Sequence, residues 1–366
     1  MNSITQISIF DYSEIEILGD LERLKIFFEN IEYGELCEEI EKERKNGRND
    51  YPVRTMLNLI YAMKIFGHRS VESFRRELAR NSQLRVVCGL SEGKYKFLND
   101  RRHLVPPARV FTGFLNKLKK HQNEIDEIFE EQVNFMYENL EGFGEDCAVD
   151  GKFLDTYGNP FQKEKCKDNR AEHEATNSCK TYEMKDGSQK KEWHYGFRGH
   201  IICDAKYGLP IKYKVTPANN SEQTELDNMI EELEESEEEK YKLEKMKNLM
   251  GDAGYDNGAR NKKLKEEYDI NAVIDIRYRW NKDEKYKEIE DTPIARDSQK
   301  FKTKYKMRTE VERLNGRIDR DYMFNDHFIR GQKKMNLMLS LTFVIMLTIA
   351  KGHIKNKQKN IRSLVA

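Results

Sequence analysis

The chain has 366 residues, and its 64 Lys and Arg balance its 64 Asp and Glu, so net charge alone indicates no class of partner. Its length suits two domains, each with its own core. The six cysteines include no CxxC pair and several lie in apolar runs, which favours reduced thiols in a cytoplasm over a disulfide framework or a zinc site.

Residues 1–140 are expected to form a helical domain, because apolar residues recur at three- and four-residue spacing. The expected helical stretches are 17–31, 51–67, 70–89 and 108–140, the last as one or two helices. Gly67 is a candidate C-cap and Ser70 a candidate N-cap. Basic clusters occur at 42–54, 101–103 and 117–121. Such clusters suit a nucleic-acid-binding module and, equally well, any helical bundle with a basic surface.

From residue 141 the sequence changes to short β-rich runs that alternate with helices. The expected order is a strand at 147–149, a hairpin of 194–205 and 209–217, a helix at 221–240, a strand at 247–254, a helix at 258–268, a strand at 271–277, and helices at 305–320 and 333–350. This order predicts an α/β domain over 141–351 with a ribonuclease-H-like mixed sheet flanked by helices, preceded by the all-α domain. The polar stretch 158–192 is expected to be an insertion or long loop, and 352–366 a basic tail.

Two segments bear on membranes and secretion. The N-terminal MNSITQISIF lacks the charged-then-apolar pattern of a signal peptide. The apolar run 335–350, MNLMLSLTFVIMLTIA, is shorter than the ~20 residues of a spanning helix and contains polar residues, so it predicts a buried core helix.

Two aspartates follow apolar strands in the same way. Asp150 comes after Cys147-Ala148-Val149 and before a glycine, and Asp252 stands in GDAGYD after another short apolar run. A carboxylate at the end of a buried strand costs free energy unless it is paired or bound to a cation. Open α/β sheets place their sites at the carboxyl ends of strands, and two carboxylates there can share a hard cation such as Mg²⁺. For either aspartate alone, a turn or N-cap role is the alternative.

A third motif lies in YKMRTEVERLNGRIDRDY, residues 305–322. On a single helix Tyr305, Arg308, Glu312 and position 319 would share one face. The alternative is a surface ion pair between Arg308 and Glu312, worth a few tenths of a kcal/mol.

Together these motifs resemble those of bacterial insertion-sequence transposases with a DDE active site. Tyr305, Arg308 and Glu312 match the first part of the family's Y-x2-R-x3-E-x6-K signature, while Asp150 in AVDGKFLD and Asp252 in GDAGYD resemble its two aspartates. The segment YGFRGHIICDAKYGLPIKYKVTPANNSE is similar to the family's hairpin, and YPVRTMLNLIYAMKIFGHRSVESFRREL with VPPARVFTGFLNKL to its helical domain. One position departs: the signature lysine falls at Asp319, where an aspartate would repel DNA phosphate.

The resemblance implies a DNA transposase that cleaves and transfers strands at the ends of an insertion sequence by a two-metal mechanism. Asp150, Asp252 and Glu312 would be the catalytic acids and the ligands of two Mg²⁺ (or Mn²⁺) ions. The residues expected to contact DNA are Tyr305, Arg308, Arg198, Arg317 and Arg320, with Arg317 or Arg320 replacing the missing lysine. The partners would be double-stranded terminal inverted repeats and target DNA, bound by a homodimer on paired ends. The protein would be cytoplasmic in a bacterium and nucleoid-associated when bound to DNA, with no membrane contact.

Two alternatives remain beside this interpretation. GDAGYD also resembles the GDxxxD motif of haloacid-dehalogenase-type phosphatases, with Asp256 as the second acid, but the nucleophile motif of that class fails at Lys152. A catalytically inactive transposase relic that only binds DNA is the other alternative. The transposase requires Asp150, Asp252 and Glu312 to converge, whereas the phosphatase requires Asp150, Asp252 and Asp256 to do so.

Overall fold

The computed structural model describes residues 19–43, 51–90, 105–160, 171–184, 188–275 and 294–363. The basic cluster at 101–103, Cys166 and residues 161–170 of the predicted polar insertion lie outside the described residues. The chain forms two compact units. The first is Met1–Gln132, Asp321–Met323 and Ser340–Ala366, and the second is Val133–Arg320 and Phe324–Leu339.

The first unit is helical throughout its described residues, as the apolar spacing predicts. Its elements are η1 (Gly19–Leu21), α2 (Glu22–Asn30), α3 (Gly34–Lys42), α4 (Val53–Ile65), α5 (Val71–Arg80), α6 (Ser82–Val87), α7 (Ala108–Leu118), most of α8 (Gln122–Asn139) and much of α14 (Gln332–Lys355). Gly67 has φ +61°, as suits a C-cap, and the Ser70 hydroxyl accepts a hydrogen bond from the Ser73 amide. The stretch after Ser70 is two helices instead of one, because the Asn81 side chain caps α6.

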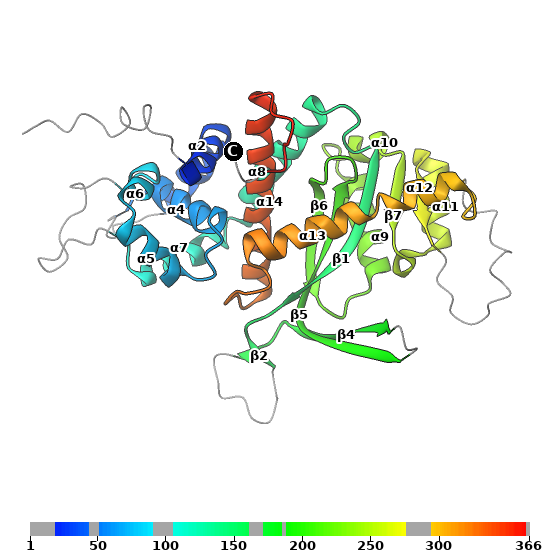
Figure 1. Ribbon diagram of the computed structural model, residues 1–366, viewed down its shortest axis with the longest axis horizontal. Coiled ribbons are helices and arrows are strands. Elements are labelled where there is room, and N and C mark those ends of the chain that lie inside the picture. Colours follow the sequence, from blue (N-terminus) through cyan, green and yellow to red (C-terminus); the bar gives the residue numbers. More distant parts are fainter. Residues whose placement is uncertain are drawn as a thin grey trace, which may run out of the picture. The chain divides into compact units, whose positions relative to one another are not determined.

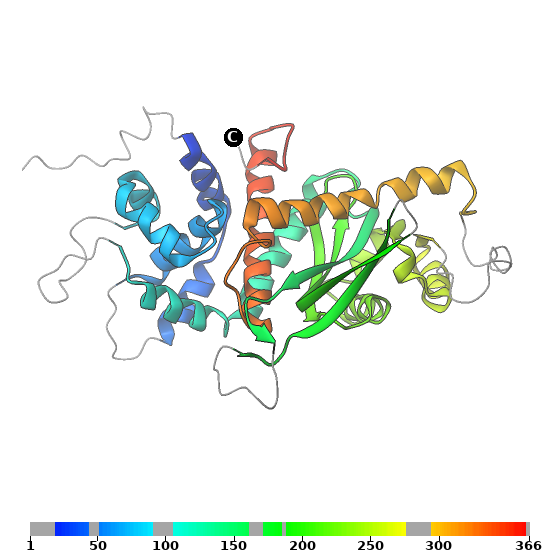
Figure 2. The same cartoon turned by 60° about the horizontal axis from the view of Figure 1, so that its bottom comes forward.

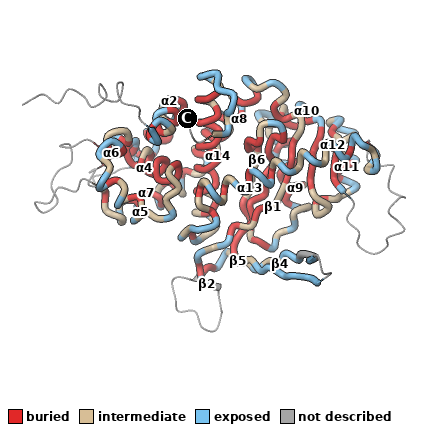
Figure 3. The backbone as a smooth tube through the Cα atoms, in the orientation of Figure 1, coloured by how far each residue is buried: buried red, intermediate tan, exposed pale blue. Residues whose placement is uncertain are grey.

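Helix α14 is long and apolar enough to cross a membrane by length and composition alone. Most of it is buried within the protein, which confirms the prediction of a core helix. Its polar residues are accommodated inside: the Gln122 side chain, for example, donates to the buried Ser340 hydroxyl at 2.7 Å. Figure 3 shows α4 and α14 as the most continuously buried helices.

The second unit is built on a six-stranded mixed sheet, which confirms the predicted fold class (Figure 1). The strand order is β4-β5-β1-β7-β8, with β6 paired to β5. The strands are β1 (Asp146–Asp155), β4 (Thr176–Glu183), β5 (Gln189–Asp204), β6 (Pro210–Pro217), β7 (Asn248–Gly251) and β8 (Asn271–Ile274), and a small separate pair is β2 (Asn159–Pro160) and β3 (Ala171–Glu172). Strand β1 is antiparallel to β5 and parallel to β7, which is parallel to β8.

Helices cover both faces of this sheet. They are α9 (Glu222–Glu235), α10 (Tyr241–Lys245), α11 (Gly258–Tyr268), α12 (Gln299–Lys306) and α13 (Thr309–Tyr322), with a short η2 (Ala253–Tyr255) after β7. Helix α13 lies on one face, and α9 and α11 lie on the other (Figures 1 and 2). Strand β1 therefore presents alternate side chains to α13 and to α9.

Three predicted boundaries were wrong. Strand β1 does not end at Val149, because antiparallel pairing with β5 continues it to Asp155. Much of the predicted polar loop is strand: β4 and the first half of β5 form a hairpin exposed on both faces, so it lacks the apolar alternation that would reveal it. The predicted helix 305–320 is broken between α12 and α13, where the Arg308 backbone N–H donates to the Tyr305 carbonyl in a tighter turn.

Candidate active site

The register of two parallel strands brings Asp150 and Asp252 together. Ala148 on β1 pairs with Met250 on β7, so Asp150, two residues further along β1, comes close to Asp252, which follows the last residue of β7. The Asp150 carboxylate accepts a hydrogen bond from Asn315 Nδ2 at 2.9 Å. Burial, and after it the negative charge of Asp252, raise the pKa of Asp150 to about 6. Both aspartates that the sequence singled out thus share one site.

Glu312 lies on α13, one turn before Asn315, but its carboxylate is turned to another partner. Arg308 Nη1 lies 2.8 Å from Glu312 Oε1, and the Glu312 side chain is 49% exposed. Within the described parts of the chain, no group of three or more His, Cys, Asp or Glu side chains is arranged to hold a metal ion. The structure therefore brings the two aspartates together and leaves Glu312 paired with Arg308.

Helix α13 runs along β1 and contacts it at two successive points. Asn315 reaches Asp150, and one turn later Asp319 Oδ2 lies 2.6 Å from the Lys152 ammonium. The Lys152 side chain is only 9% exposed. The negative charge at the signature-lysine position is therefore balanced by a lysine from the strand that carries the first aspartate.

The residues expected to contact DNA lie in different surroundings. Tyr305, at the end of α12, is half-buried, and the Arg308 guanidinium lies 5.5 Å from its ring centroid. Arg317 is part-buried and donates to the backbone carbonyl of Gly208, whereas Arg320 is exposed.

Arg198 is buried inside the site and points at a carboxylate that sequence reasoning missed. Its guanidinium lies over the Phe153 ring at 4.3 Å from the centroid and pairs with Glu222 at 2.9 Å. Glu222 is the first residue of α9, directly after the N-cap Ser221. An acid in the first turn of a helix is common and favourable for the helix dipole, so the sequence gave no reason to single it out.

The Glu222 carboxylate lies near the loop that carries Asp252, and both aspartates act on it electrostatically. Burial raises the pKa of Glu222, and the charges of Asp252 and Asp150 act in the same direction, while Arg198 opposes them. Three carboxylates, from β1, from the loop after β7 and from α9, therefore interact electrostatically.

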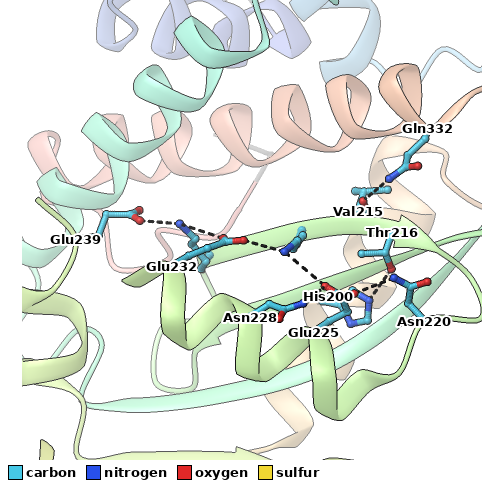
Figure 4. Close-up of polar contacts among 11 residues, drawn as sticks. His200, Val215, Thr216, Asn220, Glu225, Asn228, Glu232, Glu239 and Gln332 are labelled. Carbon is cyan, nitrogen blue, oxygen red and sulfur yellow. Dashed lines mark hydrogen bonds and ion pairs between the residues drawn. The ribbon is translucent and has the colours of Figure 1, made fainter. Parts of the chain in front are cut away.

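A polar network fixes α9 against the sheet and so positions Glu222 (Figure 4). His200 Nε2 lies 2.9 Å from the Thr216 hydroxyl, and burial lowers the pKa of His200 to about 4, so the imidazole is neutral near pH 7. Asn220 donates to Glu225 at 2.8 Å. Further along α9, Lys214 of β6 pairs with Glu232 at 2.8 Å. The contacts give His200 a structural role.

The phosphatase alternative gains no support from this geometry. The Asp256 carboxylate pairs with Arg296 at 3.5 Å. The nucleophile motif of that class needs an acid two residues after Asp150. This position holds Lys152, which is paired with Asp319.

Comparison with protein-family models gives two matches that together span both halves of the chain. The model described as "Transposase DDE domain" matches residues 141–348, more than half of the chain, and the model described as "Transposase domain (DUF772)" matches residues 15–104. No solved structure matches the chain. The first match contains β1, β7 and α13, and hence all three acids of the predicted triplet.

Proposed function

The chain belongs to the transposase DDE domain family, and we propose that it cleaves and joins DNA strands at the ends of an insertion sequence, using divalent cations at Asp150 and Asp252. The observation that carries this proposal is the proximity of those two aspartates, one on β1 and the other directly after the neighbouring parallel strand β7, where the charge of Asp252 acts on the buried Asp150 carboxylate. A buried aspartate beside a second negative charge is the arrangement that a bound cation stabilises.

The residues present fit a hard divalent cation. The donors are carboxylate oxygens, which Mg²⁺ and Mn²⁺ prefer. Next to Asp150, the buried Oδ1 of Asn315 has no hydrogen-bond partner among the described atoms. Asp150 and Asp252 would hold the metal, with Glu312 completing the site. The cations would supply Lewis acidity that activates a water or a DNA 3′-hydroxyl and stabilises the leaving oxygen.

The ion pair between Arg308 and Glu312 supports a role for bound DNA in completing the metal site. Arg308 sits at the turn before α13, and a DNA phosphate competes well for a guanidinium. We propose that Arg308 moves its charge to a phosphate when DNA binds, which frees Glu312 to turn toward Asp150. Tyr305, under the Arg308 guanidinium, would then hold the arginine in place.

Glu312→Gln should reduce strand cleavage by more than about 100-fold, beyond the loss usual for residues that only surround a metal site. DNA binding should persist, because it rests on Lys and Arg contacts with phosphates. The measurement is Mg²⁺- or Mn²⁺-dependent cutting of a plasmid with the element's own ends. Glu310→Gln, on the same helix and paired with Arg313, is the matched control. Binding without cleavage by the wild type would instead favour the inactive relic.

The expected DNA partners are the terminal inverted repeats and target DNA, and we propose that a homodimer binds paired ends in the bacterial cytoplasm. The hairpin of β4 and β5 offers a basic, exposed surface beside the site. Lys190 and Lys191 are exposed, and the Trp193 side chain is 70% exposed. Lys180, on β4, is close enough for its charge to lower the pKa of Asp150.

The double change Lys190→Ala with Lys191→Ala should weaken binding to all DNA sequences alike and lower the slope of log affinity against log salt by about 2. Each lysine is expected to neutralise one phosphate and to release its counterions. Fluorescence anisotropy across a salt series measures both quantities. The matched control is Lys262→Ala with Lys265→Ala on α11, which follows β7 toward the other edge of the sheet. An unchanged salt slope would remove the hairpin from the DNA-binding surface.

A further inference from the structure

We propose that Glu222 is a further carboxylate of the metal site, and that Glu222, Asp150 and Asp252, which form no preassembled metal-binding group among the described residues, draw together around the divalent cation as it binds. The inference rests on the proposed function, since it deepens the same site. It adds an acid that approaches from α9, on the face of the sheet opposite α13, which carries Glu312.

Two glycines leave the space that the Glu222 carboxylate occupies. A Cβ on Gly151 would stand 2.7 Å from Glu222 Oε1, and a Cβ on Gly254 would stand 3.0 Å from Glu222 Oε2. The same Cβ on Gly254 would also stand 2.7 Å from Asp252 Oδ1. Each glycine lies within two residues of one of the aspartates. Glu222 is therefore packed between strand β1, which carries Asp150, and the loop after β7, which carries Asp252.

The position of Glu222 is fixed from both ends of its side chain. At the backbone, Ser221 caps α9, and the ion pairs with β6 hold the helix on the sheet. At the carboxylate, Arg198 Nη1 lies 2.9 Å from Oε1, and Arg198 in turn donates to the Ser178 hydroxyl at 3.2 Å. Arg198 thus holds the Glu222 carboxylate near the two aspartates, whose charges act on it.

A second observation points to a ligand between these carboxylates. Tyr255, which directly follows Gly254, is completely buried, and its hydroxyl has no hydrogen-bond partner among the described atoms. Glu222, Asp150 and Asp252 all act electrostatically on this hydroxyl. A buried hydroxyl without a partner, under the electrostatic influence of three acids, can contact a cation's hydration shell or the acids that hold the cation.

The test measures Mn²⁺ binding by the full chain without DNA, by isothermal titration calorimetry, so that it does not depend on cleavage. Glu222→Gln should weaken Mn²⁺ binding at least about 10-fold, and Asp150→Asn should do the same. Glu231→Gln, an exposed acid on the same helix, should bind like the wild type. If Asp150→Asn weakens binding and Glu222→Gln does not, the role of Glu222 is refuted. If neither variant weakens it, the metal site of the proposed function fails as well.

Further variants separate loss of binding from loss of folding. Glu222→Gln leaves the Arg198 charge buried and unpaired, so the double change with Arg198→Gln removes both charges together. It should retain the wild-type circular dichroism spectrum and still bind Mn²⁺ weakly. Gly254→Ala keeps every carboxylate but displaces those of Asp252 and Glu222, so it should also weaken binding. Wild-type Mn²⁺ affinity in both folded variants would overturn the proposal.

Discussion

Asp150→Asn should abolish strand cleavage and, at the same time, stabilise the metal-free protein near pH 7.5. The Asp150 carboxylate is buried and lies beside Asp252, and burial and this neighbour raise its pKa to about 6. An asparagine keeps the shape and the contact with Asn315 but carries no charge. The difference between a pKa of about 6 and the ordinary value corresponds to at most about 3 kcal/mol of unfolding free energy.

The pH dependence has a definite sign. Because the folded pKa is raised, the native state binds the proton more tightly than the unfolded chain between about pH 4 and pH 6. The stability of the wild type therefore falls as the pH rises through that window, and the cost is fully present above it. Asp150→Asn has no carboxyl to ionise at this position, so it does not lose stability in this way. Its advantage should be largest at pH 7.5 and vanish near pH 4, which thermal melts in EDTA at both pH values would measure.

Added Mn²⁺ should make the wild type more stable than Asp150→Asn. A cation that binds only the folded wild type stabilises it by mass action, whereas the variant should gain little. Asp155→Asn, on the same strand but 60% exposed and paired with His194, is the control and should change neither property appreciably. An Asp150→Asn protein that is no more stable than the wild type at pH 7.5 would show that the two carboxylates do not repel each other.

The sequence predicted that the two aspartates lie together because a short apolar run precedes each of them and because the order of elements makes the two strands neighbours. It could not predict Glu222, since an acid after a helix cap has a sufficient local explanation. What singles out Glu222 is the space left by Gly151 and Gly254, and that space exists only once β1, α9 and the loop after β7 are assembled.

For residues 305–320 the sequence predicted one continuous helix that the chain does not form. Helical periodicity placed Tyr305 and Glu312 on one continuous helix, but backbone hydrogen bonds at Arg308 tighten the chain into a turn between two helices. Tyr305 and Arg308 remain in contact across that turn, so the motif keeps its chemistry with different backbone geometry. Spacing alone does not distinguish these two arrangements, because residues three apart are neighbours in either one.

Asp319→Ala is expected to destabilise the protein by about 2–4 kcal/mol, because it leaves the Lys152 ammonium buried without its partner. Lys152 is 9% exposed and lies 2.6 Å from Asp319, which is itself 36% exposed, so the expected cost lies toward the lower end of that range. Asp319→Lys, which restores the family signature, should be worse still, since it places two ammonium groups together. Urea unfolding of the metal-free protein measures both changes.

The double change Lys152→Met with Asp319→Lys should recover most of that stability, because a methionine fills the lysine's space without a charge and the new lysine can extend from the part-exposed position. If the double variant also binds DNA at least as tightly as the wild type, positions 152 and 319 share one positive charge, and the departure from the signature is a relocation of the lysine to the strand. If it is stable but binds DNA more weakly, Lys152 already contacts DNA from the strand while Asp319 holds it in place. In both cases the aspartate is explained by its partner on β1, and the pair links α13 to the strand that carries Asp150.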